Sequence, residues 1–67
     1  MVKISDRIIE LRKERGITQK QLAEATRVGQ STVSGWENGL FEPTASVIRE
    51  LCAYFDVSAD YLLDIER

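Results

Sequence analysis

The chain has 67 residues, of which nine are Lys or Arg, eleven are Asp or Glu and none is His, so its net charge is −2. A chain of this length predicts one small domain, residues 1–67, which buries only about 60% of the surface that its unfolded form exposes and is therefore marginally stable. Cys52 is alone, no apolar run approaches the roughly 18 residues of a membrane span, and no signal-peptide pattern is present. These features favour a soluble protein of the reducing cytoplasm without membrane contact.

Catalytic and metal sites find little support in the sequence. With no His and one Cys, the chain has no Cys-His or Ser-His pair for nucleophilic catalysis, no zinc-ligand spacing and no Gly-rich phosphate loop. Its many acids are of a kind common on solvated helices, and no two of them stand out as an acid and a base. Cys52 falls among apolar residues and is expected to be packed rather than reactive. We therefore expect no enzyme, no metal and no cofactor.

The first helix is predicted from Ser5 to about Arg15. Ser5 suits an N-cap, an acid follows in the first turn, and basic residues lie in the last turn, where the helix dipole favours them. Gly16 then provides the left-handed residue that commonly ends a helix. The apolar residues of this segment recur at helical spacing as Ile4, Ile8 and Leu11. This stripe predicts the face that packs against the core.

Two shorter helices are predicted in the middle of the chain. Thr18 and Gln21 have the spacing of a capping box, in which a hydroxyl and an amide satisfy two backbone N–H groups at a helix start. The second helix, 30–37, follows a short break and ends at an Asn-Gly pair suited to positive φ. Val33 and Trp36 share one of its faces, whereas small or amide-bearing side chains point elsewhere, namely Gln30, Ser31, Ser34 and Gly35. This arrangement indicates a helix-turn-helix, whose second helix can enter the major groove of DNA.

The remaining third of the chain predicts two more helices. Pro43 is expected to end any preceding helix and to open the next. From Thr44 onward apolar residues return at helical spacing, and this stripe is formed by Ile48, Leu51, Cys52 and Phe55. Asp56 occupies a position suited to a left-handed residue, and Ser58 can cap a short last helix that contains Tyr61. No segment shows strand alternation, so the expected fold is all-α with five short helices.

The run G-Q-S-T-V-S-G-W-E-N-G resembles the recognition helix and following loop of the phage repressor and Cro-type (XRE-like) helix-turn-helix regulators. The segments L-R-K-E-R-G-I-T-Q-K-Q-L-A and F-D-V-S-A-D-Y-L-L are similar to that family's opening and closing segments, so the resemblance covers about Ile4 to Leu63. It implies a compact five-helix, lambda-repressor-like domain. It also implies a transcriptional regulator, most often a repressor, that binds a palindromic double-stranded DNA operator as a homodimer. The chain departs from the family at Arg27, where Gly is usual, and at Gly29, where Ser or Thr is usual.

The outer face of the expected recognition helix supplies the candidate base-reading residues. Gln30 is the first choice, because a Gln amide can donate to and accept from adenine at once, and its alternative is a solvated Gln at a helix start. Ser31 and Ser34 could contact a base or a phosphate, and they could equally be surface serines without a DNA contact. Thr32 is assigned to phosphate, although it could equally pack or face solvent. Gly35 is placed in the reading surface without a side chain, either for close backbone approach to the partner or as a tolerated glycine.

The resemblance also implies contacts outside that face. Gln19, near the start of its helix, and Asn38, just past the recognition helix, match phosphate-contacting positions, with capping or solvation as the alternative. Lys20 is expected to act as a nearby cation. Arg12 and Glu37 match a pair that links the first helix to the end of the recognition helix, with two independent surface charges as the alternative.

Charge and exposed apolar residues leave a second function open. Most cations precede residue 28, whereas the last dozen residues hold Asp56, Asp60, Asp64 and Glu66. This asymmetry predicts a basic half facing DNA and an acidic half away from it. Net acidity, Gly35 and the pair Leu40-Phe41 instead support a protein-interaction or antitoxin-like module on the same fold. The dimer contact is expected at Leu40-Phe41 or at residues 61–65.

Overall fold

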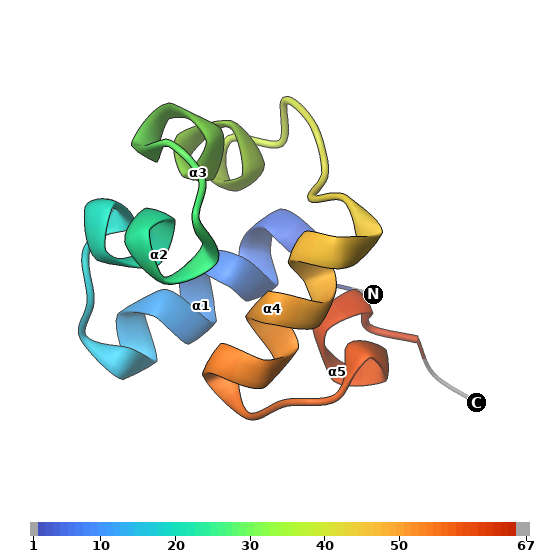
Figure 1. The fold of residues 1–67 in the computed structure, drawn as a ribbon. Coiled ribbons are helices and arrows are strands. Elements are labelled where there is room, and N and C mark those ends of the chain that lie inside the picture. Colours follow the sequence, from blue (N-terminus) through green and yellow to red (C-terminus); the bar gives the residue numbers. More distant parts are fainter. Residues whose placement is uncertain (1, 66–67) are drawn as a thin grey trace.

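The computed structural model describes residues 2–65, and Glu66, one of the acids noted above, lies outside them. Five helices follow one another and no strand occurs within this range, so the predicted all-α fold with five short helices is confirmed. They are α1 (Ile4–Arg15), α2 (Gln19–Thr26), α3 (Gln30–Glu37), α4 (Ala45–Phe55) and α5 (Ala59–Leu63). Figure 1 shows α2 and α3 together at one end of the molecule, with α1, α4 and α5 forming the body beside them.

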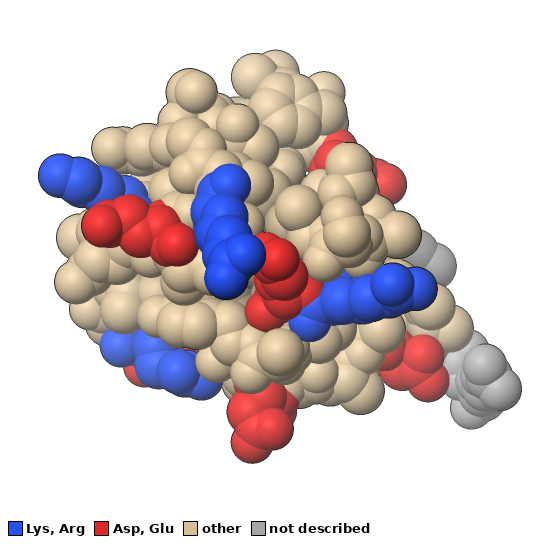
Figure 2. All heavy atoms as spheres, in the orientation of Figure 1, with Lys and Arg blue, Asp and Glu red and all other residues tan. Residues whose placement is uncertain are grey.

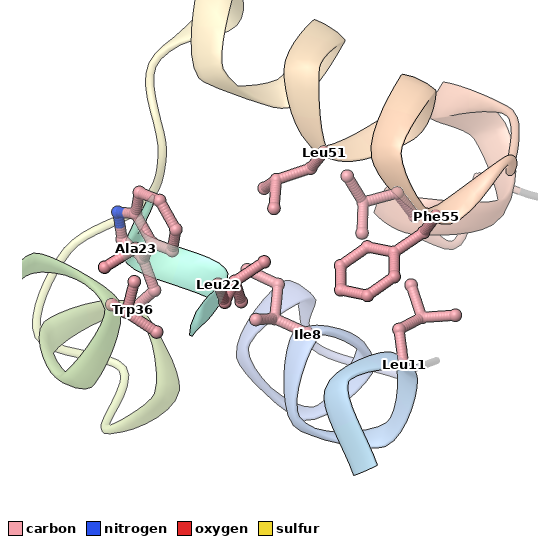
Figure 3. Close-up of a cluster of buried hydrophobic side chains, with 9 residues drawn as sticks. Ile8, Leu11, Leu22, Ala23, Trp36, Leu51 and Phe55 are labelled. Atoms are coloured by element: carbon pink, nitrogen blue, oxygen red, sulfur yellow. The ribbon is translucent and has the colours of Figure 1, made fainter. Parts of the chain in front are cut away.

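One core holds the five helices together. Leu22 and Ile8 lie near its centre, Trp36 closes one end and Phe55 lies at the other (Figure 3). Burying a large apolar side chain contributes about 1.5–3 kcal/mol, so this cluster is the main source of stability in so small a chain. The full set of buried apolar residues is Ile8, Leu11, Leu22, Ala23, Val33, Trp36, Leu51, Phe55 and Leu62.

The predicted helix boundaries hold except at the first helix start. α1 begins at Ile4 with Lys3 as its N-cap, so the prediction that Ser5 caps this helix is wrong. Ser5 lies inside the first turn and is 8% exposed. It is three residues before Ile8 and therefore shares its face, so a helix that buries Ile8 also turns Ser5 inward. Gly16 ends α1 with φ 69°, as expected.

The later caps follow the sequence closely. Asp56 is left-handed at φ 55°, and the Ser58 hydroxyl accepts from the Tyr61 backbone N–H at 3.1 Å, as expected. In the Asn38-Gly39 pair only Gly39 has a positive φ, at 72°, whereas Asn38 is at φ −88°. One left-handed residue is enough to turn the chain out of α3, so the expectation for Asn38 is corrected.

Candidate DNA-binding surface

Local backbone chemistry shapes both the start of α2 and the turn between α2 and α3. The capping box is present in full: the Gln21 backbone N–H donates to the Thr18 hydroxyl at 3.1 Å, and the Thr18 N–H donates to the Gln21 amide oxygen at 2.8 Å. Arg27 is left-handed at φ 60°, a conformation that costs a non-glycine residue roughly 1 kcal/mol. Gly29 is the N-cap of α3 and supplies no side-chain acceptor. The turn therefore tolerates both departures from the usual family residues.

The inner face of α3 is fixed by the core, and this determines which residues face outward. Val33 is 0% and Trp36 2% exposed. Gln30 and Ser31 are exposed, and Ser31 lies on the side of the helix opposite Val33, whereas Thr32 and Ser34 are half-buried. The structure therefore brings the proposed base-reading side chains together on one helix, with the half-buried ones less accessible than the sequence suggested.

Gly35 differs from the other members of that set. It is buried, and the ring of Phe41, from the loop that follows α3, covers it. The sequence had suggested either a close approach to the partner or simple tolerance of glycine. The structure shows instead that Phe41 of the same chain approaches Gly35 closely. The expectation that Gly35 lies open on the base-reading surface is therefore wrong.

A network of charged and polar side chains ties α3 to α1 and α2. The Arg12 guanidinium donates twice to the Glu37 carboxylate, from Nε to Oε2 at 2.6 Å and from Nη2 to Oε1 at 3.2 Å. Its Nη1 also donates to the Ile17 carbonyl at 2.9 Å. The two charged side chains are 16% and 6% exposed, so this is a largely desolvated bidentate pair and not two independent surface charges. It fixes the end of α3 relative to α1.

Gln19 joins the same network. Its Nε2 donates to Glu37 Oε1 at 3.0 Å, so the side chain is half-buried and held against α3. Lys20, the next residue, is exposed at the start of α2. Asn38 is exposed beyond α3, where its amide donates to the Ser34 hydroxyl at 3.2 Å. Gln19 and Asn38 thus have intramolecular partners and keep further donor or acceptor capacity for a ligand.

The face in Figure 2 does not show the expected separation into a basic and an acidic half. On the face in Figure 2, basic and acidic side chains lie next to one another, and the upper part, over α3, carries neither. Two of the cations assigned to a basic half are also paired, because Arg12 binds Glu37 and Arg7 lies 3.4 Å from both Glu10 and Asp64. Within residues 30–41 the only charged residue is Glu37, which is already neutralised. The outer face of α3 is therefore polar and uncharged.

A second set of contacts, between α1 and α5, was missed in the sequence. The Arg7 guanidinium lies 4.1 Å from the centre of the Tyr61 ring and donates to Asp64 at 3.4 Å. The Val2 backbone N–H also donates to the Asp64 carboxylate. These partners are far apart in the chain and have no local signal, so only the tertiary fold reveals them. They hold the last helix against the first.

Burial raises the pKa of the Cys52 thiol, which packs against the core as expected. Within residues 2–65, no group of three or more His, Cys, Asp or Glu side chains is placed to hold a metal ion. None of the helices in that range has the length and apolar character needed to cross a bilayer.

A short capped helix, a tight turn and a second helix anchored by its inner face define a helix-turn-helix protein. A family model described as "Helix-turn-helix" matches residues 8–62. The chain thus belongs to the XRE-type helix-turn-helix family.

Solved structures share the whole fold. The P22 c2 repressor, in a crystal structure with a synthetic operator, aligns with a TM-score of 0.90 at 29% identity, covering 98% of this chain and 100% of that one. SinR, described as the master regulator for biofilm formation and solved in complex with DNA, aligns with a TM-score of 0.80 at 35% identity, covering 88% and 95%. The lambda-repressor-like fold implied by the sequence is confirmed.

Curated relatives include the transcriptional regulator ImmR of Bacillus subtilis (strain 168), 33% identical over 60 residues that make up 90% of this chain and 47% of ImmR. The transcriptional activator BcrR of Enterococcus faecalis is 31% identical over 66 residues, 98% of this chain and 32% of BcrR. The chain therefore spans from about a third to about half of the length of these two relatives.

Proposed function

We propose that this protein is a sequence-specific, double-stranded DNA-binding transcriptional regulator that inserts α3 into the major groove. The observation that carries this proposal is the rigid placement of α3, whose inner face is buried while its outer face is polar and uncharged. An α-helix fits the major groove, where amide and hydroxyl side chains distinguish base edges. The P22 c2 repressor and SinR complexes with DNA support it. A protein that binds chromosomal DNA would act in the cytoplasm.

Each candidate residue has a proposed role on that DNA. Gln30 reads a base, because its exposed amide stands at the first turn of α3. Ser31 and Ser34 supply shorter base or sugar-edge contacts. Phosphate contacts come from side chains near the ends of α2 and α3, and at the start of α2 the free backbone N–H groups also favour an anion. These residues are Gln19, Lys20, Thr32 and Asn38.

We further propose a homodimer on a palindromic operator, acting as a repressor. A single small module makes few phosphate contacts, so two copies on half-sites about 34–36 Å apart bind far more tightly. Leu40 and Phe41 are 74% and 50% exposed, and Tyr61 and Ile65 are 41% and 49% exposed. Such large exposed apolar side chains favour a contact between copies. We also propose that residues 1–67 form a single helix-turn-helix domain.

Selection from a random duplex pool tests this function. The purified chain is incubated with the pool at two salt concentrations, and the bound sequences are recovered and aligned. We expect a two-fold symmetric consensus whose half-sites are about one helical turn apart. Recovery of a single unpaired half-site would contradict the dimer, and recovery of no consensus at all would contradict sequence-specific binding.

A second candidate function is recognition of a protein partner, as in an antitoxin-like module. The neutral outer face of α3 and the 74% exposure of Leu40 favour it, because nonspecific DNA affinity depends on cations. SinR has also been solved in a complex with SinI protein on a related fold. Salt titration separates the two functions. Binding to DNA falls steeply as salt rises, whereas an apolar protein contact is nearly indifferent to it.

A further inference from the structure

The ring of Phe41 lies where the side chain of residue 35 would be. Gly35 is in the middle of α3, and a Cβ added to it would have its three nearest atoms, Phe41 Cζ, Cε2 and Cε1, all within 3.0 Å. Heavy atoms do not pack so closely, so the ring occupies this place only because residue 35 is glycine. Phe41 is nevertheless 50% exposed. The tip of its ring thus covers α3, while much of the ring surface remains open.

This position borders the outer face of α3. At 3.6 residues per turn, residue 35 is about 40° around the helix from residue 31 and about 160° from the core-facing residue 33. Ser31 is exposed and Val33 is fully buried. A ring stacked over Gly35, about one helical turn after Ser31, therefore lies on the side of α3 that faces away from the core.

The chemistry of that ring selects one feature of the groove. The base edges of the major groove present hydrogen-bond donors and acceptors and a single apolar group, the C5-methyl of thymine. Phe41 has no polar atom in its side chain, and the neighbouring outer face of α3 carries no charge. We propose, building on the function above, that Phe41 contacts a thymine methyl and so replaces the missing side chain at position 35. Leu40 is 74% exposed and contributes no atom to the contact with Gly35, so in this proposal it forms the contact between the two copies.

Replacing thymine by uracil in the selected operator tests this proposal, because it removes the methyl and leaves every hydrogen-bonding group in place. Each thymine is changed in turn in both half-sites, and the Kd of the full chain is measured. We expect wild type to lose about 4-fold in affinity per half-site at one symmetric position, or about 16-fold for both. Phe41→Ala is expected to bind thymine and uracil operators equally at that position, whereas Leu40→Ala keeps the wild-type preference.

Gly35→Ala gives a second test that leaves Phe41 itself in place. The added Cβ pushes the ring away from α3, so the methyl preference should fall towards unity. Ala also favours a helix interior over Gly, so the melting temperature should not fall greatly. Retention of the full preference in this variant would show that the ring need not lie over residue 35, which would overturn the proposal.

Other outcomes distinguish this proposal from the proposed function. If wild type binds its operator but tolerates uracil at every thymine, the methyl contact is refuted and DNA binding stands. The methyl contact is likewise refuted if Phe41→Ala weakens every duplex equally and raises the dimer dissociation constant, because the ring is then a protein contact. If no duplex is selected, the proposed function itself fails and this contact falls with it.

Discussion

Replacing Arg12 by Ala should destabilise the protein markedly. The substitution removes both donors to Glu37 and the donor to the Ile17 carbonyl, leaving the Gln19 amide as the remaining partner of a carboxylate that is 6% exposed. Removing one member of a buried ion pair typically costs 3–5 kcal/mol, and the remaining amide reduces this to about 2–3 kcal/mol here. For a domain of this size the melting temperature should fall by roughly 10–20 °C.

Thermal unfolding followed by circular dichroism measures this loss, with Lys13→Ala as the control. Lys13 is exposed on the same helix, so its replacement should stay within about 0.5 kcal/mol. Replacing Arg12 and Glu37 together by Met removes both charges and should recover most of the loss, because the cost comes from the unpaired carboxylate. Arg12→Ala should also weaken binding to all DNA sequences, since α3 loses its anchor. A melting temperature within about 3 °C of wild type, or a double variant no more stable than Arg12→Ala, would refute this reasoning.

The other predictions concern contacts with DNA and the thiol. Gln30→Ala should cost about 1–3 kcal/mol on the selected operator and relax preference at one symmetric position. A uniform loss over all duplexes would instead make Gln30 a phosphate ligand. Lys20→Ala should weaken binding to every duplex by a similar factor and should reduce the slope of log binding constant against log salt concentration by about one per phosphate contacted. An unchanged slope would show that Lys20 does not contact DNA. The raised pKa of the Cys52 thiol means that its contribution to stability is present below the ordinary thiol pKa and is lost as pH rises through the raised value. Unfolding measured across this alkaline range should therefore show a decline that Cys52→Ala lessens, and an identical decline in both proteins would contradict it.

The helices were predictable because the residues that begin and end them lie close together in the sequence. The Thr18-Gln21 capping box, the left-handed Gly16 and the Ser58 cap each depend on residues within one turn, so their signals survive in the sequence alone. Ser5 was the exception, because the need to bury Ile8 outweighed a cap of about 1 kcal/mol. Local chemistry predicts a helix start only where the core does not compete for the same residue.

The contacts that position α3 were harder to predict, because they join residues distant in the chain. Resemblance to the family suggested the Arg12–Glu37 pair, but not the Gln19 amide that completes it. The packing of Phe41 on Gly35 had only an indirect signal, a glycine within a helix followed by a large apolar residue after its end. The glycine indicates that α3 has no side chain at position 35. Only the path of the following loop shows that Phe41 covers that position.

The central claim is that the outer face of α3 reads DNA sequence. The most direct test is the ratio of affinities for the selected operator and for a scrambled duplex of the same length and composition, measured at about 150 mM salt. Specific binding by such a protein is at least about 10³-fold tighter than its nonspecific binding. We predict a ratio of this size for wild type and a ratio lowered at least several-fold in Gln30→Ala. Equal affinity of the wild-type protein for both duplexes would contradict the claim.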